Sequence, residues 1–460
     1  MSLKFIYIWQ IKEYRLDRFI SYLKEAGILS VFYKLKPHKA ALSARNLLII
    51  LGNTLLFLVL GVLTVQTRIS IVFAIILAVL APFLGFFVTS ITVALTSILS
   101  RYKKEALINE AKRKVHTSQA TFIAITGSYG KTTTKELLYG LISKKYRVKK
   151  TEKTINTDVG IAASIVKDLK PSTQFFIAEI GAYKRGEIEK AIRIFKPSYA
   201  ILTAIGNQHL DLFGSRDDLI AAKSEIFTSL KKGGKAYINK DIKEYRRISY
   251  SLEEYTLFSA NQPADIAVKA AKSTPNGIKA QVVYGKKTFN ITLKLLGAHN
   301  LANLLPAIAV ASDIGMSVGE IETAVSELKP IPDKLSIHNG ISGTTVVSDA
   351  GNSNLEGFMS AIETLAQFPQ KTKIIVSKGI IELGVEKRKS YKRILEALVK
   401  TDIQLFTTDR LFHEMNNTQT KYFPDEKLII DELTKNFSKD TAVLIEGKFT
   451  PGFINATIYP

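Results

Sequence analysis

From residue 117 onward, short apolar runs alternate with longer stretches in which apolar residues recur at a helical spacing. The short runs are typical of buried strands, and the longer stretches are typical of helices that pack on a sheet. This alternation predicts an α/β fold with mostly parallel sheets. The expected strands are Phe122–Thr126, Phe175–Glu179, Tyr199–Thr203, Lys235–Ile238, Thr345–Ser348, Lys373–Ser377, Gln404–Thr407 and Ala442–Ile445. The expected helices include Thr132–Ser143, Arg216–Lys231, Leu301–Ile314, Leu355–Ala366 and Tyr391–Leu398.

Two domains are expected within this α/β region. Residues near 250–295 are rich in strand-forming side chains and predict a β-meander inserted in the first domain. Two prolines in Lys329-Pro330-Ile331-Pro332 interrupt the pattern between a helix and a strand, which indicates a boundary. We therefore expect a central P-loop domain at 117–329 and a Rossmann-like C-terminal domain at 330–460.

Two uncharged stretches precede the α/β region, at 46–67 and 69–100, with Arg68 between them. Because about 20 apolar residues suffice to cross a bilayer core, they predict a transmembrane helical hairpin at 46–100. A hairpin buried in a protein core would have the same pattern. Basic residues flank both stretches, so the positive-inside rule puts both flanks in the cytoplasm. We expect a two-span protein of the inner (cytoplasmic) membrane with cytoplasmic catalytic domains.

The segments beside the predicted hairpin are basic. Residues 1–45 mix aromatic and basic side chains, which suits an amphipathic cytoplasmic segment lying on anionic headgroups. A small helical bundle packed on the rest of the protein is the alternative. Residues 101–116 would form a basic juxtamembrane linker.

The chain has 460 residues, a formal net charge of +22 and no cysteine. Residues 1–115 hold sixteen Lys or Arg against five Asp or Glu, so half of the excess lies around the predicted membrane segment. This distribution favours a membrane lipid bilayer over nucleic acid as a partner. The absence of cysteine excludes disulfides, thiolate metal ligands and cysteine nucleophiles.

A glycine-rich loop follows the first expected strand and leads into a helix. Its glycines let successive N–H groups face phosphate oxygens, its lysine adds a cation, and its first threonine adds a hydroxyl for magnesium. We therefore expect ATP and Mg²⁺ as ligands. Only two residues separate the glycines where a standard P-loop has four, and an ordinary strand-to-helix turn is the alternative. The residues expected to bind the nucleotide here are Gly127, Ser128, Tyr129, Gly130, Lys131, Thr132 and Thr133.

Further candidate side chains follow the next strands. Glu179 ends the second expected strand, where a carboxylate can hold magnesium beside the P-loop. His209 follows the third strand and Lys223 lies on the next helix; alone, each would be an ordinary loop or surface residue. Asn300 and Asn303 lie at a helix start, where paired amides can contact a base or cap the helix.

Together these pieces resemble the Mur ligase family, the ATP-dependent enzymes that build the cell-wall peptide. The matching motifs are the short Gly-x-x-Gly-Lys-Thr loop, Glu-Ile-Gly-Ala at 179–182, the segment 205–211, Ala-Lys-x-Glu-Ile at 222–226 and Gly-x-His-Asn-x-x-Asn at 297–303. The branch that they most resemble joins D-alanyl-D-alanine to UDP-N-acetylmuramoyl-tripeptide. The short glycine spacing is then a mark of the family.

The resemblance implies a role for each catalytic candidate. Thr132, Glu179 and His209 would hold magnesium ions that bridge the phosphates, and Lys131 would neutralise charge on the transferred phosphoryl group. Lys223 would be carbamylated by carbon dioxide, which gives it a carboxylate-like group for a metal. Carbamylation requires an uncharged amine, so burial would have to lower the pKa of this lysine.

The resemblance also implies nucleoside contacts. Asn300 and Asn303 would contact the adenine, and Asp349 of the C-terminal domain would reach the ribose. Lys334 stands where the family has an arginine, which keeps the charge and loses the bidentate geometry. Where the family has Asp-x-Tyr-Asn-Ala-Asn-Pro, this chain has Asp-Ala-Gly-Asn-Ser-Asn-Leu at 349–355 and lacks the aromatic ring.

The implied reaction transfers the γ-phosphate of ATP to a substrate carboxylate, after which an amine attacks the acyl phosphate to form an amide. The partners would be a small-molecule cell-wall precursor and an amino acid or dipeptide. Residues 1–116 contain no recognisable UDP-binding domain of the family's kind, so a Mur-type ligase acting on a lipid-linked or other carboxylate is an alternative. A membrane-anchored P-loop ATPase coupled to transport or regulation is the alternative of another class.

Overall fold

The structure is a computed structural model that describes Gln10 and residues 44–66, 71–206, 213–250, 252–351, 353–380, 383, 386–415 and 418–458. The chain forms two compact units, Met1–Leu107 and Ile108–Pro460. Of the predicted amphipathic segment at 1–45, all but Gln10 and residues 44–45 lie outside the described residues.

Two long helices make up most of the described first unit. Helix α4 spans Ala44–Gln66, and helix α5 runs from Ile71 to Thr117, past the end of that unit. The helices contact each other where Asn53 of α4 donates a 3.1 Å hydrogen bond to the hydroxyl of Thr89 of α5. Both side chains are buried, so this polar contact fixes how the two helices pair.

The predicted membrane hairpin is contradicted by the structure. Within the described ranges, no helix combines the length and the apolar character needed to cross a bilayer. The described parts of the uncharged stretches are helical, but α5 does not end with its uncharged part and continues through Arg101, Lys103 and Lys104. The prediction of a two-span protein of the inner membrane is therefore wrong, and the expected lipid partner is not supported.

A nine-stranded sheet, counted over the described residues, forms the core of the first lobe of the second unit. Its strands are β1 (Thr121–Thr126), β2 (Val148–Lys150), β3 (Phe175–Glu179), β4 (Tyr199–Leu202), β5 (Lys235–Asn239), β6 (Tyr255–Ser259), β7 (Ile266–Thr274), β8 (Gly277–Tyr284) and β9 (Lys287–Leu293). The spatial order is β2-β3-β1-β4-β5-β6-β7-β8-β9. Strands β2 to β7 pair in parallel, whereas β7, β8 and β9 form an antiparallel meander at one edge.

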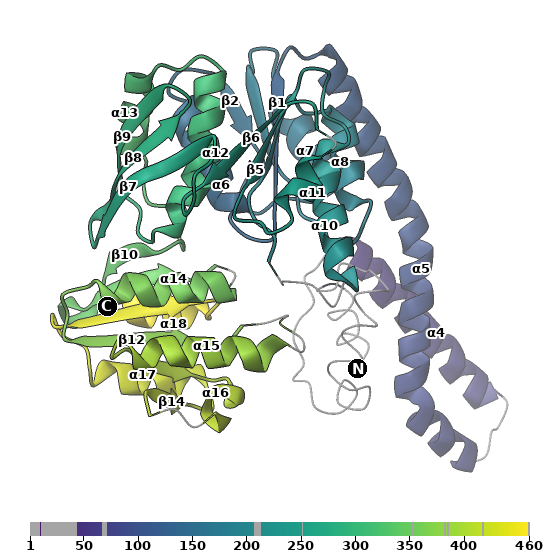
Figure 1. Ribbon diagram of the computed structural model, residues 1–460. Helices are drawn as coiled ribbons and strands as arrows, with labels where there is room; N and C mark the ends of the chain where they lie inside the picture. Colours follow the sequence, from purple (N-terminus) through teal and green to yellow (C-terminus); the bar gives the residue numbers. More distant parts are fainter. Residues whose placement is uncertain are drawn as a thin grey trace. The chain divides into compact units, whose positions relative to one another are not determined.

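Helices cover both faces of this sheet (Figure 1). One face carries α6 (Lys131–Ile142), α12 (His299–Asp313) and α13 (Val318–Ser326), whose apolar side chains share a core with the strands. The opposite side carries α7 (Asp158–Asp168), α8 (Glu187–Phe195), α10 (Arg216–Ser224), the 3₁₀ turn η1 (Glu225–Phe227) and α11 (Tyr245–Ser249). There the ring of Phe122 lies between those of Phe176 and Phe195, with centroid distances of 5.7 and 5.4 Å.

The second lobe is built on a six-stranded sheet, again counted over the described residues. Its strands are β10 (Ser336–Asn339), β11 (Thr345–Asp349), β12 (Thr372–Ser377), β13 (Gln404–Thr407), β14 (Thr420–Tyr422) and β15 (Thr441–Glu446), in the order β10-β11-β15-β12-β13-β14. All pairs are parallel except β10 with β11. The 3₁₀ turn η2 (Ile341–Gly343) joins this antiparallel pair.

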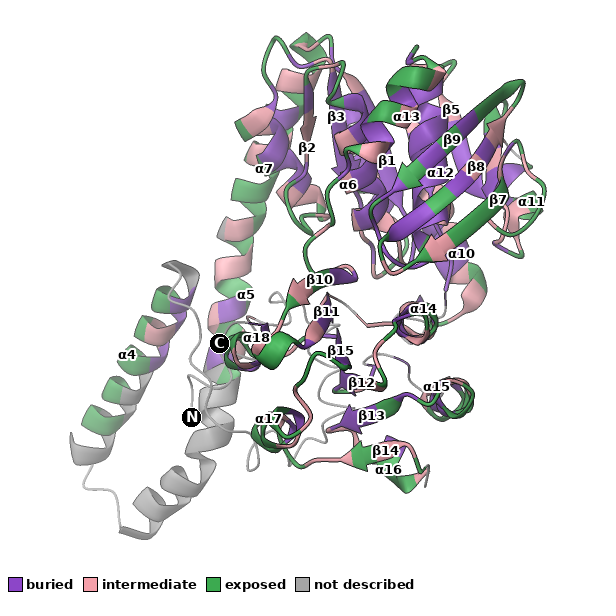
Figure 2. Cartoon of the chain, turned by 90° about the vertical axis from the view of Figure 1, so that its left-hand side faces the viewer, coloured by how far each residue is buried: buried purple, intermediate pink, exposed green. Residues whose placement is uncertain are grey.

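Two apolar cores sandwich the second sheet. One contains side chains of α14 (Leu355–Ala366), α15 (Lys387–Val399) and α16 (Arg410–Glu414), and the other those of α17 (Glu426–Thr434) and α18 (Pro451–Ile458). Figure 2 shows the central strands of both sheets as buried, as expected for parallel sheets covered on two faces.

The strand predictions are confirmed, since each expected strand occurs within one residue of its predicted ends. The predicted meander is also confirmed as β7 to β9. The helix expected at Arg216–Lys231 is too long, because α10 ends at Ser224 and a 3₁₀ turn follows. That turn buries Ile226 and Phe227, which a continuous helix would place differently. The predicted domain bounds stay a prediction.

Candidate active site

The loop from Gly127 to Gly130 connects β1 to the N-terminus of α6. Both glycines have positive φ, +152° and +82°, a region that other residues rarely adopt. A Cβ at Gly127 would collide with the hydroxyl of Thr203, and one at Gly130 with the side-chain oxygen of Asn303. The sequence therefore needs glycine at both positions, and the backbone can approach a ligand closely.

Lys131 begins α6 and folds back over the loop. Its Nζ donates hydrogen bonds of 2.8 Å to the carbonyl oxygen of Gly127 and 3.1 Å to that of Ser128. Burial lowers the pKa of Lys131, and the carboxylate of Glu179 partly offsets this effect. The cation therefore lies at the predicted phosphate-binding loop.

Thr132 and Glu179 meet between α6 and the end of β3. The Thr132 hydroxyl donates a 2.9 Å hydrogen bond to Oε2 of Glu179, and Asn156 donates one of 3.2 Å to Oε1. The Nζ of Lys135 lies 3.5 Å from the same Oε2, and the Glu179 and Lys135 side chains are buried. A buried carboxylate with this many partners is held in one orientation, with its oxygens beside the loop.

Lys223 lies near the end of α10 and is 3% exposed. Its Nζ lies 3.5 Å from the carbonyl oxygen of Ala182 and 5.7 Å from the ring centroid of Phe213. Burial and then the charge of Lys131 lower the pKa of the Lys223 amine to about 7. A fraction of this amine is therefore uncharged at neutral pH, which is the form that carbamylation requires.

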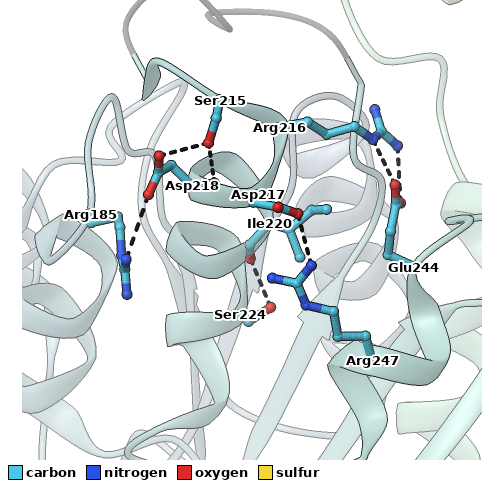
Figure 3. A network of polar contacts seen from close by, with 9 residues as sticks. All are labelled: Arg185, Ser215, Arg216, Asp217, Asp218, Ile220, Ser224, Glu244 and Arg247. Atoms are coloured by element: carbon cyan, nitrogen blue, oxygen red, sulfur yellow. Dashed lines mark hydrogen bonds and ion pairs between the residues drawn. The ribbon is translucent and has the colours of Figure 1, made fainter.

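A polar network holds α10 in place (Figure 3). Ser215 caps the helix, because its hydroxyl accepts a 3.0 Å hydrogen bond from the N–H of Asp218. Arg216 donates two hydrogen bonds, of 2.7 and 3.0 Å, to Glu244, while Arg247 lies 2.8 Å from Asp217. These contacts fix the first turn of α10. Because the helix is rigid, they also determine the position of Lys223 in its last turn.

Asn300 and Asn303 lie on the first turn of α12, behind the phosphate-binding loop. Asn303 donates a 3.3 Å hydrogen bond to the side-chain oxygen of Asn300, and the side-chain NH₂ of Asn300 donates one of 2.6 Å to the carbonyl oxygen of Leu296. Both are buried, and the Asn303 oxygen lies against Gly130. The structure thus places the pair as a support for the loop; their contact with adenine stays a prediction.

Asp349 and Lys334 lie together in the second lobe. Burial raises the pKa of Asp349 to about 6, and the Lys334 ammonium opposes this rise. Gly351 leaves room for that ammonium, because a Cβ there would come within 2.5 Å of the Lys334 Nζ. The Lys334 side chain therefore occupies the space beside Gly351.

Parts of both lobes line one cavity of about 460 Å³. The first lobe contributes the phosphate-binding loop with Thr132, Glu179 and Lys223, and the second contributes Lys334, Ser353, Lys378, Glu446 and Lys448. The cavity brings together the predicted residues of the loop, Glu179, Lys223 and Lys334. Asn300, Asn303 and Asp349 do not line it. His209 lies outside the described residues, so its placement stays a prediction.

The residues present fit the phosphates of ATP and a magnesium ion. The glycine cradle and the helix N-terminus suit phosphate oxygens, and the buried hydroxyl of Ser128 has no partner among the described residues. Thr132 and Glu179 provide the oxygen donors that Mg²⁺ prefers. No cluster of three acidic or histidine side chains occurs in the part of the chain that the structure describes.

Sequence reasoning missed several residues of this site. Asn156 and Lys135 hold Glu179, from which both are distant in sequence. Asn156 lies outside every recognised motif, and Lys135 follows the threonines of the glycine-rich loop without a role of its own in the motif. Glu446 could have been found, because it directly follows the expected strand Ala442–Ile445 as Glu179 ends Phe175–Glu179. A carboxylate at the carboxyl end of a parallel strand was the available signal.

The P-loop lobe, the second α/β lobe and the cavity that they line define a two-lobed nucleotide-binding α/β enzyme. The Mur ligase middle domain matches residues 125–311, and the Mur ligase glutamate ligase domain matches residues 335–449. The chain belongs to the Mur ligase family. It is thus an ATP-dependent ligase that uses Mg²⁺.

Individual relatives agree with this assignment. The UDP-N-acetylmuramoyl-tripeptide–D-alanyl-D-alanine ligase of Escherichia coli is 25% identical over 332 residues, 71% of this chain and 73% of the relative. The ligase of the same name from Buchnera aphidicola is 29% identical over 324 residues, 69% of each chain. The MurF ligase of Thermotoga maritima, solved in complex with ADP, is 25% identical and has a TM-score of 0.69, covering 75% of this chain and 80% of that one.

Proposed function

We propose that this chain joins D-alanyl-D-alanine to UDP-N-acetylmuramoyl-tripeptide with hydrolysis of ATP. The observation that carries the proposal is the cavity in which the P-loop, the Thr132–Glu179 pair and the buried Lys223 face side chains of the second lobe. An enzyme that only hydrolyses ATP, with no second substrate to accept the phosphoryl group, would not need the polar side chains that the second lobe contributes to the cavity. The relatives that bear this activity in their names match more than two thirds of the chain.

The first lobe would bind and orient the phosphates. The N–H groups after Gly127 would contact phosphate oxygens, and Lys131 would leave its two loop carbonyls to neutralise the phosphoryl group in transfer. Thr132 and Glu179 would hold Mg²⁺, with His209 as a further proposed ligand. When bound, the ion offsets charge on the phosphate oxygens.

Lys223 would act as a carbamate. Its amine has a pKa of about 7 and a buried position beside the carbonyl oxygen of Ala182. Reaction with carbon dioxide would turn a buried cation into an anion, which suits a site that must also hold a divalent ion. The proposal that Asn300 and Asn303 meet the adenine and Asp349 the ribose rests on the family pattern. The packing of the two amides behind Gly130 supports a part in nucleotide binding.

The lobes would then bring two substrates together. The tripeptide carboxylate accepts the γ-phosphoryl group, and the amine of the dipeptide attacks the resulting acyl phosphate. An amine and a carboxylate do not condense at useful rates in water, so activation and a fixed mutual orientation account for the reaction. Lysines at positions 334, 378 and 448 line the part of the cavity that the second lobe contributes and suit the anionic groups of this substrate.

The test is a reaction of purified protein with ATP, Mg²⁺, UDP-N-acetylmuramoyl-tripeptide and D-alanyl-D-alanine. We expect one phosphate released for each amide, measured by phosphate assay and mass spectrometry, and neither product when one substrate is omitted. The Lys131→Ala variant serves as the inactive control. Phosphate release without a new amide would contradict the proposal and favour a simple ATPase.

A further inference from the structure

Glu446 is a buried carboxylate in the cavity wall, and one of its two oxygens has no hydrogen-bond partner among the described residues. It ends β15, is 1% exposed and lines the cavity. Ser353 donates a 2.6 Å hydrogen bond to its Oε1, which fixes the orientation of the carboxylate. Its Oε2 has no hydrogen-bond partner among the described residues. Such a group is costly to bury, so an unsatisfied oxygen beside a cavity points to a ligand that satisfies it.

A second carboxylate lies next to it. Glu446 and Asp349 are opposite each other on the neighbouring parallel strands β15 and β11, at the carboxyl ends of both strands. Burial, and then the charge of Asp349, raises the pKa of Glu446 well above its ordinary value. The charge of Lys334 acts on both carboxylates, and the charge of Asp333 acts on Asp349 as well. Negative groups therefore outnumber the single ammonium at this place. The arrangement favours binding of a further cation.

The rest of the described cavity wall has the opposite charge. Five lysines line it, at positions 131, 223, 334, 378 and 448, against the carboxylates of Glu179 and Glu446 alone. The lysines suit phosphates and carboxylates, and Glu179 is already bonded to Thr132 and Asn156. Glu446 is therefore the carboxylate of this wall that remains for a positively charged substrate group.

We propose that Glu446 binds the ammonium group of the incoming amino substrate and removes one of its protons before it attacks the acyl phosphate. This inference rests on the proposed function and names the residue that prepares the nucleophile. An ammonium has no lone pair, so it must lose a proton before it can form a bond to carbon. A carboxylate whose pKa is raised by burial is a better proton acceptor than an exposed one.

The step balances as follows. The ammonium donates one proton to the Glu446 carboxylate, and the freed lone pair forms the C–N bond. The bond between the acyl carbon and the phosphate oxygen then breaks, and its electron pair leaves on the phosphate. The nitrogen loses its second proton to that phosphate, so the products are the amide, hydrogen phosphate and a protonated Glu446.

The test compares the Glu446→Gln variant with wild type in two separate half-reactions. Acyl phosphate formation, measured by borohydride trapping without dipeptide, should be unchanged. Amide formation with D-alanyl-D-alanine should fall about 100-fold, within the range of one general base. Hydroxylamine, which is largely uncharged at neutral pH, should still capture the acyl phosphate as a hydroxamate. Glu446→Asp should recover part of the amide rate. The control is Glu432→Gln, at a partly exposed glutamate that does not line the cavity, and it should match wild type in every assay.

Three other results of these assays would contradict the inference. Amide formation by Glu446→Gln within threefold of wild type would overturn the inference, and so would loss of acyl phosphate or hydroxamate formation in that variant. Failure of the wild type to form any acyl phosphate from UDP-N-acetylmuramoyl-tripeptide would overturn the proposed function, and the inference with it. The acid side of the pH profile gives a further check. For wild type, kcat/KM for the dipeptide should fall as Glu446 is protonated, and in Glu446→Gln this dependence should be lost.

Discussion

The hydroxyl of Thr132 donates a 2.9 Å hydrogen bond to the carboxylate of Glu179, although 47 residues separate the two in sequence. Strand β3 pairs with β1, and β1 leads into the loop before α6, so the sheet register brings the two side chains together. The pair is thus a product of topology as much as of the P-loop motif, and it provides the oxygen donors beside the phosphate-binding loop.

Removal of the Thr132 hydroxyl should weaken magnesium-dependent turnover. In Thr132→Val the side chain keeps its shape and loses one oxygen donor. We expect kcat/KM for ATP to fall about 10- to 100-fold, the range for residues that support a bound metal. A magnesium titration of the rate should show a higher midpoint. Thr134→Val is the control, because the buried Thr134 hydroxyl has no hydrogen-bond partner among the described residues and its loss should leave the titration unchanged.

A side chain at Gly130 should abolish nucleotide binding. Gly130→Ala places a methyl group against Asn303 at a φ of +82°, so the loop must move. Gly186→Ala is a matched control with a φ of +83° and no atom within 4 Å of the added Cβ. Both variants should lose about 1–2 kcal/mol of stability from the left-handed backbone conformation. Calorimetric titration with ADP should show lost binding in Gly130→Ala alone; equal affinities would contradict a tight phosphate cradle.

The cap of α10 should matter for activity as well as for stability. Ser215→Ala removes the side-chain cap, and we expect about 1 kcal/mol less stability by urea unfolding. Because the same helix carries Lys223, kcat should fall too. Ser317→Ala removes the comparable cap of α13, away from the cavity, and should cost similar stability with kcat unchanged. If both variants keep full kcat, the cap has no part in positioning the lysine.

Activity should depend on carbon dioxide in a pH-dependent way. The Lys223 amine has a pKa of about 7, lowered from its ordinary value, so it is mostly uncharged above pH 7 and mostly protonated below. Carbamylation needs the uncharged form, so degassed enzyme should lose activity, most strongly below pH 7, and added bicarbonate should restore it. Lys223→Ala should be inactive with or without bicarbonate, and Lys232→Ala should behave as wild type. Full activity of Lys223→Ala would remove the carbamate role.

The α/β region was predictable because buried parallel strands are short, apolar and clearly bounded. Phe175–Glu179 and Gln404–Thr407 coincide with the observed strands for this reason. The end of the helix at Ser224 was not predictable from periodicity. Ile226 and Phe227 continue the apolar pattern of a helix, and only their burial in the folded chain reveals a tighter turn.

The site residues that belong to a sequence motif were predictable. The residues that reach the site only through the packing of the folded chain were not. The spacing of the loop identifies Gly127, Gly130 and Lys131 as candidates, and the position of Glu179 at a strand end identifies that carboxylate. Asn156 reaches Glu179 from a loop that has no recognised pattern. The uncharged stretches at 46–67 and 69–100 gave the opposite error, since their composition indicated membrane spans that the described helices do not provide.

Gly351 and Lys334 carry a consequence for evolution within close homologues. The lysine amino group occupies the space that any side chain at position 351 would need. A lineage that acquires a bulky residue at 351 must therefore move the end of the residue 334 side chain to another position. Positions 334 and 351 should covary, although 17 residues and a strand pair separate them along the chain.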